Sequence, residues 1–270
     1  MVAFSNINLV IAHKLEAEHL IHGFALEAVE SDNYQLYRNQ EGMQAIICGM
    51  GYDNARAATE YLASLDLHFA EARGWLNVGI AGHQSAGLGS CLVANRIVHK
   101  ATGKCAYPAL IFTEPGSSEV MTVDRPELEY PQDIAYEMEA AGFWAAAVRH
   151  TSLEFVQCLK IISDNKSHST DKITPKQIRM IMRNNFEIIK QCCARLQKLV
   201  EEYNEPSRVG EVVASLIERH HFTVTQQHQL KRLWQRYNAL GKKRDFDEIV
   251  SQTHSSGKKI INELDEKIKV

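Results

Sequence analysis

The sequence predicts that two acidic side chains, Glu139 and Asp164, are buried. Glu139 stands in residues 136–142, an alanine-rich stretch that predicts an apolar helix. Asp164 ends residues 159–164, an apolar run that predicts a strand and closes on Ser163 and Asp164. A buried carboxyl group is costly unless it is paired, hydrogen-bonded or used in chemistry. The two positions therefore indicate a site for acid–base chemistry.

Strands and helices that could position these carboxylates alternate along the first part of the chain. Two of the predicted strands form a hairpin around Glu41 and Gly42. Strands that alternate with helices favour a sheet covered by helices, which binds ligands at the carboxyl ends of its strands. We predict strands at residues 7–12, 34–38, 45–48, 75–79, 92–100, 109–113 and 158–163, and helices at residues 14–23 and 54–65.

The pattern changes to helices in the last hundred residues. Residues 174–177 form a capping box with Pro175 at the first helical position, which predicts one helix that runs to a break at residues 204–207. The remainder, residues 205–270, has helical periodicity, and residues 223–226 resemble another helix start. The sequence therefore predicts a small all-helical extension.

One predicted helix of the extension has an apolar face and a basic face. The basic face has two interpretations. It could be a docking surface for nucleic acid or for an acidic partner, or it could be the solvated side of a helix that packs by its apolar face. Acidic residues nearby, such as Asp245 and Asp247, favour the second interpretation, so we expect no nucleic-acid partner. His220 and His221 lack companion ligands at metal-binding spacing. The apolar face consists of Leu230, Leu233, Trp234, Tyr237 and Leu240, and the basic face of Lys231, Arg232, Arg236, Lys242, Lys243 and Arg244.

The composition is that of an ordinary globular protein. The 270 residues are 45% hydrophobic, and 30 basic against 33 acidic residues give a net charge of −3, which indicates no general affinity for nucleic acid or membrane. The six cysteines show no CxxC spacing, and most of them lie in apolar runs where a free thiol behaves as a small hydrophobic side chain. Because we find no signal peptide and no apolar run that could span a bilayer, we expect a soluble cytoplasmic protein. We also expect that the protein uses no metal and no cofactor.

Residues 136–142 and 159–164, by their order and spacing, resemble two signature segments of the nucleoside phosphorylase/nucleosidase superfamily. This superfamily includes purine nucleoside phosphorylases and methylthioadenosine/S-adenosylhomocysteine nucleosidases, which cleave the N-glycosidic bond of nucleosides. The resemblance covers about residues 5–200. It implies a nucleoside phosphorylase-like α/β fold of three layers, with a mixed central sheet flanked by helices. It also implies a catalytic domain at residues 1–204, a C-terminal helical extension at residues 205–270, and a homo-oligomer.

The resemblance gives roles to three carboxylates. Asp164 would protonate the leaving base, and Ser163 would orient Asp164. Glu139, which follows Met138, would bind the 2′- and 3′-hydroxyls of the ribose. Glu16 lies at the predicted first strand–helix junction, where hydrolytic members of the superfamily carry a glutamate that activates water.

Each role has a structural alternative. A Ser-Asp pair such as the one that ends in Asp164 also favours a turn. Glu137 or Glu139 could be a solvated residue on a helix surface, although the apolar neighbours of Glu139 weaken this alternative for Glu139. Glu16 lies in a first helical turn, where the helix dipole favours a carboxylate without any function. Glu18, two residues later, could correspond to the glutamate of the superfamily instead of Glu16.

A glycine-rich loop at residues 79–83 bears on the choice between hydrolysis and phosphorolysis. Phosphorylases of the superfamily often carry an arginine where this chain has Asn77, and an asparagine there resembles the hydrolytic members. Ile80 replaces a common serine and His83 a common glycine, which weakens a phosphate site. We expect Ile80 and Gly82 to line the substrate pocket.

The stretch between residues 92 and 137 is shorter than in the superfamily, so the sequence assigns no residue that stacks on the base. We predict hydrolysis of the N-glycosidic bond of a purine nucleoside, an adenosine derivative modified at its 5′ position. Phosphorolysis of a purine nucleoside, with phosphate as a second ligand, is the alternative reaction. The departures at Ile80 and His83 leave open a protein that binds nucleosides without catalysis.

Overall fold

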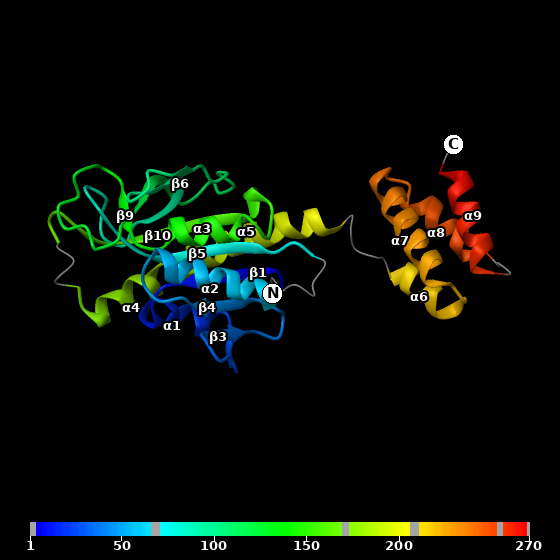
Figure 1. Cartoon of the computed structure of the whole chain (residues 1–270), viewed down its shortest axis with the longest axis horizontal. Coiled ribbons are helices and arrows are strands. Elements are labelled where there is room, and N and C mark those ends of the chain that lie inside the picture. Colours follow the sequence, from blue (N-terminus) through cyan, green and yellow to red (C-terminus); the bar gives the residue numbers. More distant parts are fainter. Residues whose placement is uncertain (1–3, 66–70, 169–172, 206–210, 253–255, 269–270) are drawn as a thin grey trace. The chain divides into compact units, whose positions relative to one another are not determined.

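The chain divides into two compact units, Met1–Glu201 and Glu202–Val270 (Figure 1). Each unit has buried hydrophobic clusters of its own. The break that the sequence predicts at residues 204–207 includes Pro206 and Ser207, which lie outside the described residues. The computed structural model describes residues 4–65, 71–168, 173–205, 211–252 and 256–268.

The first unit is built on a mixed sheet, in which the described residues form ten strands. The strands are β1 (Ile7–Ile11), β2 (Glu27–Val29), β3 (Gln35–Arg38), β4 (Gln44–Ile47), β5 (Gly74–His83), β6 (Cys91–His99), β7 (Cys105–Ala106), β8 (Gly116–Thr122), β9 (Ala135–Glu137) and β10 (Val156–Asn165). The order is β10-β6-β8-β9-β5-β1-β4-β3-β2, with β7 beside β6. Strand β10 also pairs with β5, which closes the first five strands of this order into a ring. Strands β1, β5 and β10 are parallel to one another, so their carboxyl ends meet at one edge.

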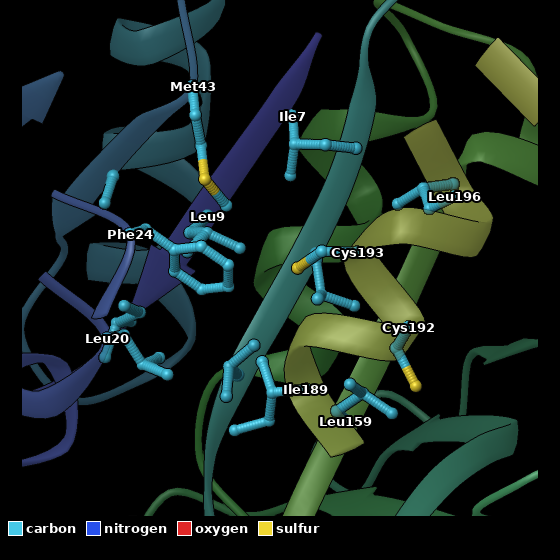
Figure 2. Close-up of a cluster of buried hydrophobic side chains, with 14 of the residues drawn as sticks. Ile7, Leu9, Leu20, Phe24, Met43, Leu159, Ile189, Cys192, Cys193 and Leu196 are labelled. Carbon is cyan, nitrogen blue, oxygen red and sulfur yellow. The ribbon is translucent and has the colours of Figure 1, made fainter. Parts of the chain in front are cut away.

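Helices cover both faces of this sheet, which confirms the predicted fold class. The helices α1 (Lys14–Gly23), α4 (Pro175–Asn184) and α5 (Phe186–Asn204) contribute to the core on one face, and α2 (Tyr52–Leu65) and α3 (Ala140–Ala147) to the core on the other. Strand β1 alternates between the two cores, because successive side chains of a strand point to opposite faces. Leu9 packs with Leu20 and Ile189 on the first face (Figure 2), and Val10 packs on the second.

The predicted single helix between residues 175 and 203 is wrong, because the chain forms two helices there. Helix α4 begins with the predicted capping box of Thr174 and Gln177 and ends at Asn185. The Nδ2 atom of Asn185 donates hydrogen bonds to the carbonyls of Ile181 and Gly89, at 2.9 and 3.1 Å. Asn185 thus satisfies one of the last carbonyls of α4 and ties this helix end to the loop at Gly89, and α5 starts at the next residue.

Several local predictions differ from the observed strands. Residues 79–83 are not a loop, because they continue β5 beside β10. Residues 109–113 form no strand, because Ile111 and Phe112 pack against the core as side chains of a loop whose Ala109 carbonyl accepts a hydrogen bond from Gln157. Instead, Gly116–Thr122 forms strand β8 between β6 and β9.

The second unit consists of helices in its described part, namely α6 (Glu211–Arg219), α7 (Val224–Ala239), α8 (Lys243–Ser251) and α9 (Gly257–Lys267). Thr223 and Gln226 form the predicted capping box of α7. Leu230, Leu233, Trp234 and Tyr237 are buried as predicted, but Leu240 is 54% exposed because α7 ends one residue before it. Within the described residues, no helix is long and apolar enough to cross a membrane.

Candidate active site

A cavity of about 360 Å³ lies at the edge of the sheet where β1, β5 and β10 end. Its volume is in the range of pockets that bind small molecules. The sequence predicted seven residues for the site, and all of them line this cavity: Glu16, Ile80, Gly82, Met138, Glu139, Ser163 and Asp164. These seven residues come from four segments that are far apart in the sequence.

Glu16 enters the cavity from the first turn of α1. Its Oε2 accepts a hydrogen bond from the amide of His13 at 2.9 Å, and its Oε1 accepts one from the amide of Ile80 in β5 at 3.0 Å. Burial raises the pKa of Glu16, although these amides and Lys160 oppose the shift. The competing residue Glu18 points elsewhere, because its side chain is 54% exposed and pairs with Arg179.

The sequence predicts that Glu139 lies inside a helix, but in the structure it lies immediately before α3. Its Oε1 accepts a hydrogen bond from the amide of Gly51 at 2.8 Å, so the loop after β4 and the start of α3 meet at this carboxylate. Burial, followed by the nearby carboxylate of Glu137, raises the pKa of Glu139 to about 7. A carboxyl group with such a pKa changes its charge near neutral pH.

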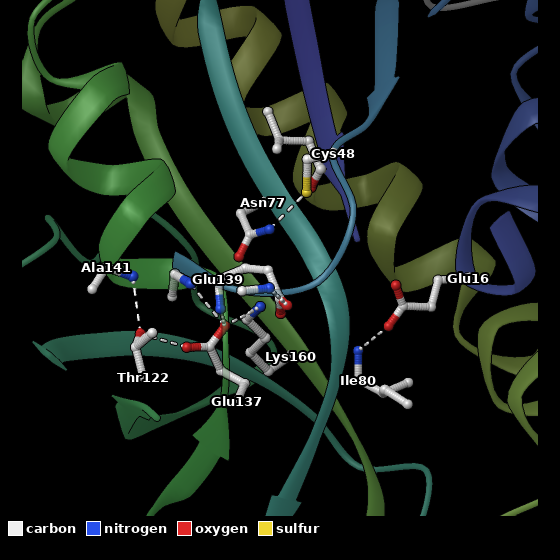
Figure 3. A network of polar contacts seen from close by, with 12 residues as sticks. Glu16, Cys48, Asn77, Ile80, Thr122, Glu137, Glu139, Ala141 and Lys160 are labelled. Carbon is white, nitrogen blue, oxygen red and sulfur yellow. Dashed lines mark hydrogen bonds and ion pairs between the residues drawn. The ribbon is translucent and has the colours of Figure 1, made fainter. Parts of the chain in front are cut away.

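Glu137 and Lys160 form a buried ion pair beside Glu139 (Figure 3), and the predicted site omits both. Lys160 is only 1% exposed, and its Nζ lies 2.7 Å from Oε2 of Glu137. The same oxygen accepts hydrogen bonds from the amides of Glu139 and Ala140, and Oε1 accepts one from Thr122 at 2.6 Å. Glu137 is therefore a buried residue that caps α3 and not a solvated helix residue. A lone lysine in an apolar strand is the signal that could have revealed the pair.

Asp164 lies inside strand β10 and not in a turn, and it is 4% exposed. The pairing of β10 with β5 shifts register between Ile162 and Asp164, and such a bulge redirects the side chains next to it. Ser163 Oγ donates a hydrogen bond to Oδ1 of Asp164, and the hydroxyl of Tyr130 donates one to Oδ2. The sequence pointed to Ser163 but gave no sign of Tyr130.

Asn77 and His83 are absent from the lining of the cavity. Asn77 is buried in β5, where its Nδ2 donates to the carbonyl of Val10 at 3.0 Å. His83 uses Nδ1 to accept hydrogen bonds from the amides of Ser85 and Ala86, and burial lowers its pKa. The departure at His83 thus leaves the cavity unchanged, whereas the side chain of Ile80 forms part of its wall.

The wall of the cavity combines acidic and apolar side chains. Among the described lining residues, none is a lysine or an arginine. The apolar part offers surfaces on which a planar ring could stack, and it consists of Ala12, Leu15, Met50, Ile80, Ala81, Val123, Pro126, Tyr136, Met138, Ile173 and Ile178. The described residues contain no cluster of His, Cys, Asp and Glu that could hold a metal ion.

Comparison with known proteins gives matches of fold. No protein-family model and no curated protein matches the chain. The 5′-methylthioadenosine/S-adenosylhomocysteine nucleosidase of Colwellia psychrerythraea, solved with adenine, matches with a TM-score of 0.56 and 16% identity, over 73% of this chain and 96% of that one. The corresponding nucleosidase of Helicobacter pylori matches with a TM-score of 0.55 and 14% identity, over 69% and 98%.

Futalosine hydrolase of Helicobacter pylori matches equally well, with a TM-score of 0.55 and 14% identity over 70% of this chain and 98% of that one. These identities are low, so the likeness concerns the backbone. The chain therefore has the fold of these nucleosidases and of futalosine hydrolase, which agrees with the fold that its sequence predicts.

Proposed function

We propose that the protein hydrolyses the N-glycosidic bond of a purine nucleoside. The observation that supports this best is the meeting of Glu16, Glu139 and Asp164 in one buried cavity. These carboxylates come from three separate elements, and a nucleosidase needs an acid, a base and a group that holds the sugar. The fold of the chain agrees with this chemistry, because nucleosidases share it.

In the proposed reaction Asp164 gives its proton to a ring nitrogen of the purine as the bond from C1′ to the base breaks. The bonding electrons leave with the base. Glu16 takes a proton from a water molecule whose oxygen forms the new bond to C1′, and burial prepares it for this task by raising its pKa. Glu139 holds the ribose hydroxyls, and the carboxylates stabilise the positive charge that develops on the sugar.

The charge of the cavity favours water over phosphate as the nucleophile. Phosphate sites use arginine, lysine or several backbone amides as donors. The described lining residues include five carboxylates and no lysine or arginine. Lys160 is already paired with Glu137, and its Nζ lies 2.7 Å from that carboxylate. The described lining therefore offers a phosphate dianion no lysine or arginine to bind it, and phosphorolysis remains the second candidate reaction.

The apolar part of the lining supports a substrate with an apolar group at its 5′ position. Met50, Ile173 and Ile178 could cover such a group. The matching nucleosidases are named for 5′-methylthioadenosine and S-adenosylhomocysteine, which are adenosine derivatives modified at this position. We propose an adenosine derivative of this class as the substrate, and a homo-oligomer as the active form, which light scattering would test.

Chromatography of the free base released from a panel of purine nucleosides, with and without phosphate, tests the proposal. We expect release that does not depend on phosphate. Asp164→Asn and Glu16→Gln should each lower kcat by about 10²-fold or more. Glu18→Gln is the matched control for Glu16→Gln, because Glu18 is exposed on the same helix. Strict dependence on phosphate would show phosphorolysis, and thermal stabilisation by nucleosides without any base release would show a binding protein.

A further inference from the structure

The hydroxyl of Tyr130 reaches the carboxylate that serves as the acid in the proposed reaction. It donates a hydrogen bond to Oδ2 of Asp164, on the opposite oxygen from Ser163. Tyr130 belongs to the connection between β8 and β9, yet it is only 1% exposed. A buried tyrosine hydroxyl needs a polar partner, and the partner here is the side chain of Asp164.

The backbone of Tyr130 is strained, with φ at +45°. Bulky residues rarely adopt this conformation, and it persists only where surrounding contacts enforce it, often at functional sites. The surrounding contacts are present. The Tyr130 carbonyl accepts a hydrogen bond from Nε2 of Gln84 at 2.8 Å, and its ring meets the ring of Tyr136 edge to face. The amide of Gln132 then donates to the hydroxyl of Tyr136 at 3.0 Å, which fixes the connection from a second side.

Gly82 provides the space in which Tyr130 and Asp164 meet. A Cβ atom at residue 82 would lie 2.5 Å from Cε1 of Tyr130 and 2.6 Å from Oδ2 of Asp164. Both distances are far below van der Waals contact, so a side chain at this position would separate the two groups. The glycine of β5, the strained residue of the loop and the acid of β10 therefore form one packed arrangement.

We propose that Tyr130 is a positioning residue for the acid of this reaction, an inference that rests on the proposed function. When Asp164 gives its proton to the base, it becomes a carboxylate, and hydrogen bonds to an ionised acceptor are stronger than those to a neutral one. The hydroxyls of Tyr130 and Ser163 then stabilise the new charge. Before the transfer, the Tyr130 hydroxyl can instead accept the proton of neutral Asp164, since a phenol both donates and accepts.

Tyr130→Phe in the full chain tests this role, because it keeps the ring and removes the hydroxyl. Two substrates are compared: the best purine nucleoside of the panel, and a 4-nitrophenyl riboside, whose leaving group departs as a stable anion and needs no acid. We expect kcat for the nucleoside to fall about 10-fold, with KM changed less than about 2-fold. The kcat for the nitrophenyl riboside should not change. Tyr61→Phe is the control, since it removes a hydroxyl that bonds Ser31 away from the cavity.

The outcomes separate this inference from the proposed function. An unchanged kcat for the nucleoside in Tyr130→Phe, or an equal loss on both substrates, would overturn the role of Tyr130 and leave nucleoside hydrolysis intact. Absence of base release by the unaltered protein would instead overturn the proposed function, and this inference with it. If Tyr130→Phe folds poorly, Gln84→Ala provides a second test, because Gln84 lies outside the described lining of the cavity and its Nε2 holds the carbonyl of Tyr130. This variant should likewise lower kcat for the nucleoside more than kcat for the nitrophenyl riboside.

Discussion

Glu137 and Glu139 are two residues apart and have different surroundings. Glu137 accepts hydrogen bonds from Thr122 and from two amides of the α3 start, and it pairs with Lys160. Glu139 accepts one from Gly51. Because Glu137 accepts the hydrogen bonds of the backbone amides at the start of α3, the carboxylate of Glu139 is not used as a helix cap and can face a ligand in the cavity. The hydrogen-bond donors around each carboxylate thus decide that Glu137 stabilises α3 and that Glu139 is available to a ligand.

The raised pKa of Glu139 makes the stability of the protein depend on pH. The folded state holds a proton on Glu139 up to about pH 7, whereas the unfolded chain loses it near the ordinary value of 4.5. Stability from this group is therefore present below pH 4.5 and is lost as the pH rises through 7. Glu139→Gln has no carboxyl group to titrate, so its free energy of unfolding should not show this decrease. From pH 5 to pH 8, the free energy of unfolding of the variant should rise by roughly 2 kcal/mol relative to that of the unaltered protein. Urea unfolding at both values measures this, and an identical difference at both would contradict it.

The buried ion pair should be far more sensitive to the loss of one partner than an exposed pair of the same length. Lys160→Met leaves Glu137 charged and buried without its cation, which should destabilise the protein by about 3–5 kcal/mol. Arg179→Met breaks the pair with Glu18, which is also 2.7 Å long but exposed, and should cost less than about 1 kcal/mol. Chemical unfolding of both variants at neutral pH checks the contrast, and equal losses would contradict it.

Helix α3 places Glu139 at the cavity through a close approach to α2. A Cβ atom at Gly142 would lie 2.0 Å from the carbonyl oxygen of Tyr52, at the start of α2. The nearest atom belongs to the backbone and cannot move aside like a flexible side chain. Glycine is therefore required at Gly142 by the packing of two helices, even though it weakens the helix that contains it.

Gly142→Ala should destabilise the protein by about 1–3 kcal/mol, because the clash with α2 outweighs the better helix propensity of alanine. It should also lower kcat, since α3 carries Glu139 at its start. Ala145→Gly, at an exposed position of the same helix, tests propensity alone and should cost about 1 kcal/mol with unchanged activity. Thermal unfolding and base release measure both effects, and a stabilised Gly142→Ala variant would show that the helices are not in contact there.

At the scale of the whole molecule, the chain has two units whose cores share no residue. The described residues that line the cavity all belong to the first unit. The second unit has its own buried aromatic cluster, in which Trp234 meets Phe246 and the hydroxyl of Tyr237 donates to the carbonyl of Leu264. We propose that residues 205–270 form a separate domain, because a core of this kind can hold helices together without the sheet.

Separate cores predict two unfolding transitions in scanning calorimetry. Leu9→Ala removes side-chain atoms from the core of the first unit, and Leu230→Ala does the same in the second. Each should lower the midpoint of one transition, by an amount that corresponds to about 2–5 kcal/mol, and leave the other in place. A single transition that both substitutions shift would show that the units unfold together and would contradict the proposed domain.

The sequence by itself determined much of the fold and part of the site. Apolar runs such as that around Leu9 predicted buried strands, and the capping boxes at Thr174 and Thr223 predicted helix starts that the structure confirms. Glu16, Glu139 and Asp164 were also predicted, because each lies in a local context that resembles a known motif. All of these features depend on neighbours within a few residues along the chain.

The tertiary structure alone decided which distant groups meet. Tyr130 bonds Asp164 across 34 residues, and the partner of Lys160 lies on another strand. The lone lysine in an apolar strand signals that some partner exists, but no local pattern identifies the partner of Lys160 or of Asp164. The division of the predicted helix at Asn185 follows in part from the carbonyl of Gly89, 96 residues away. Hydrophobic periodicity fixes the face that a segment buries, but a side chain's polar partner depends on how the whole sheet is ordered.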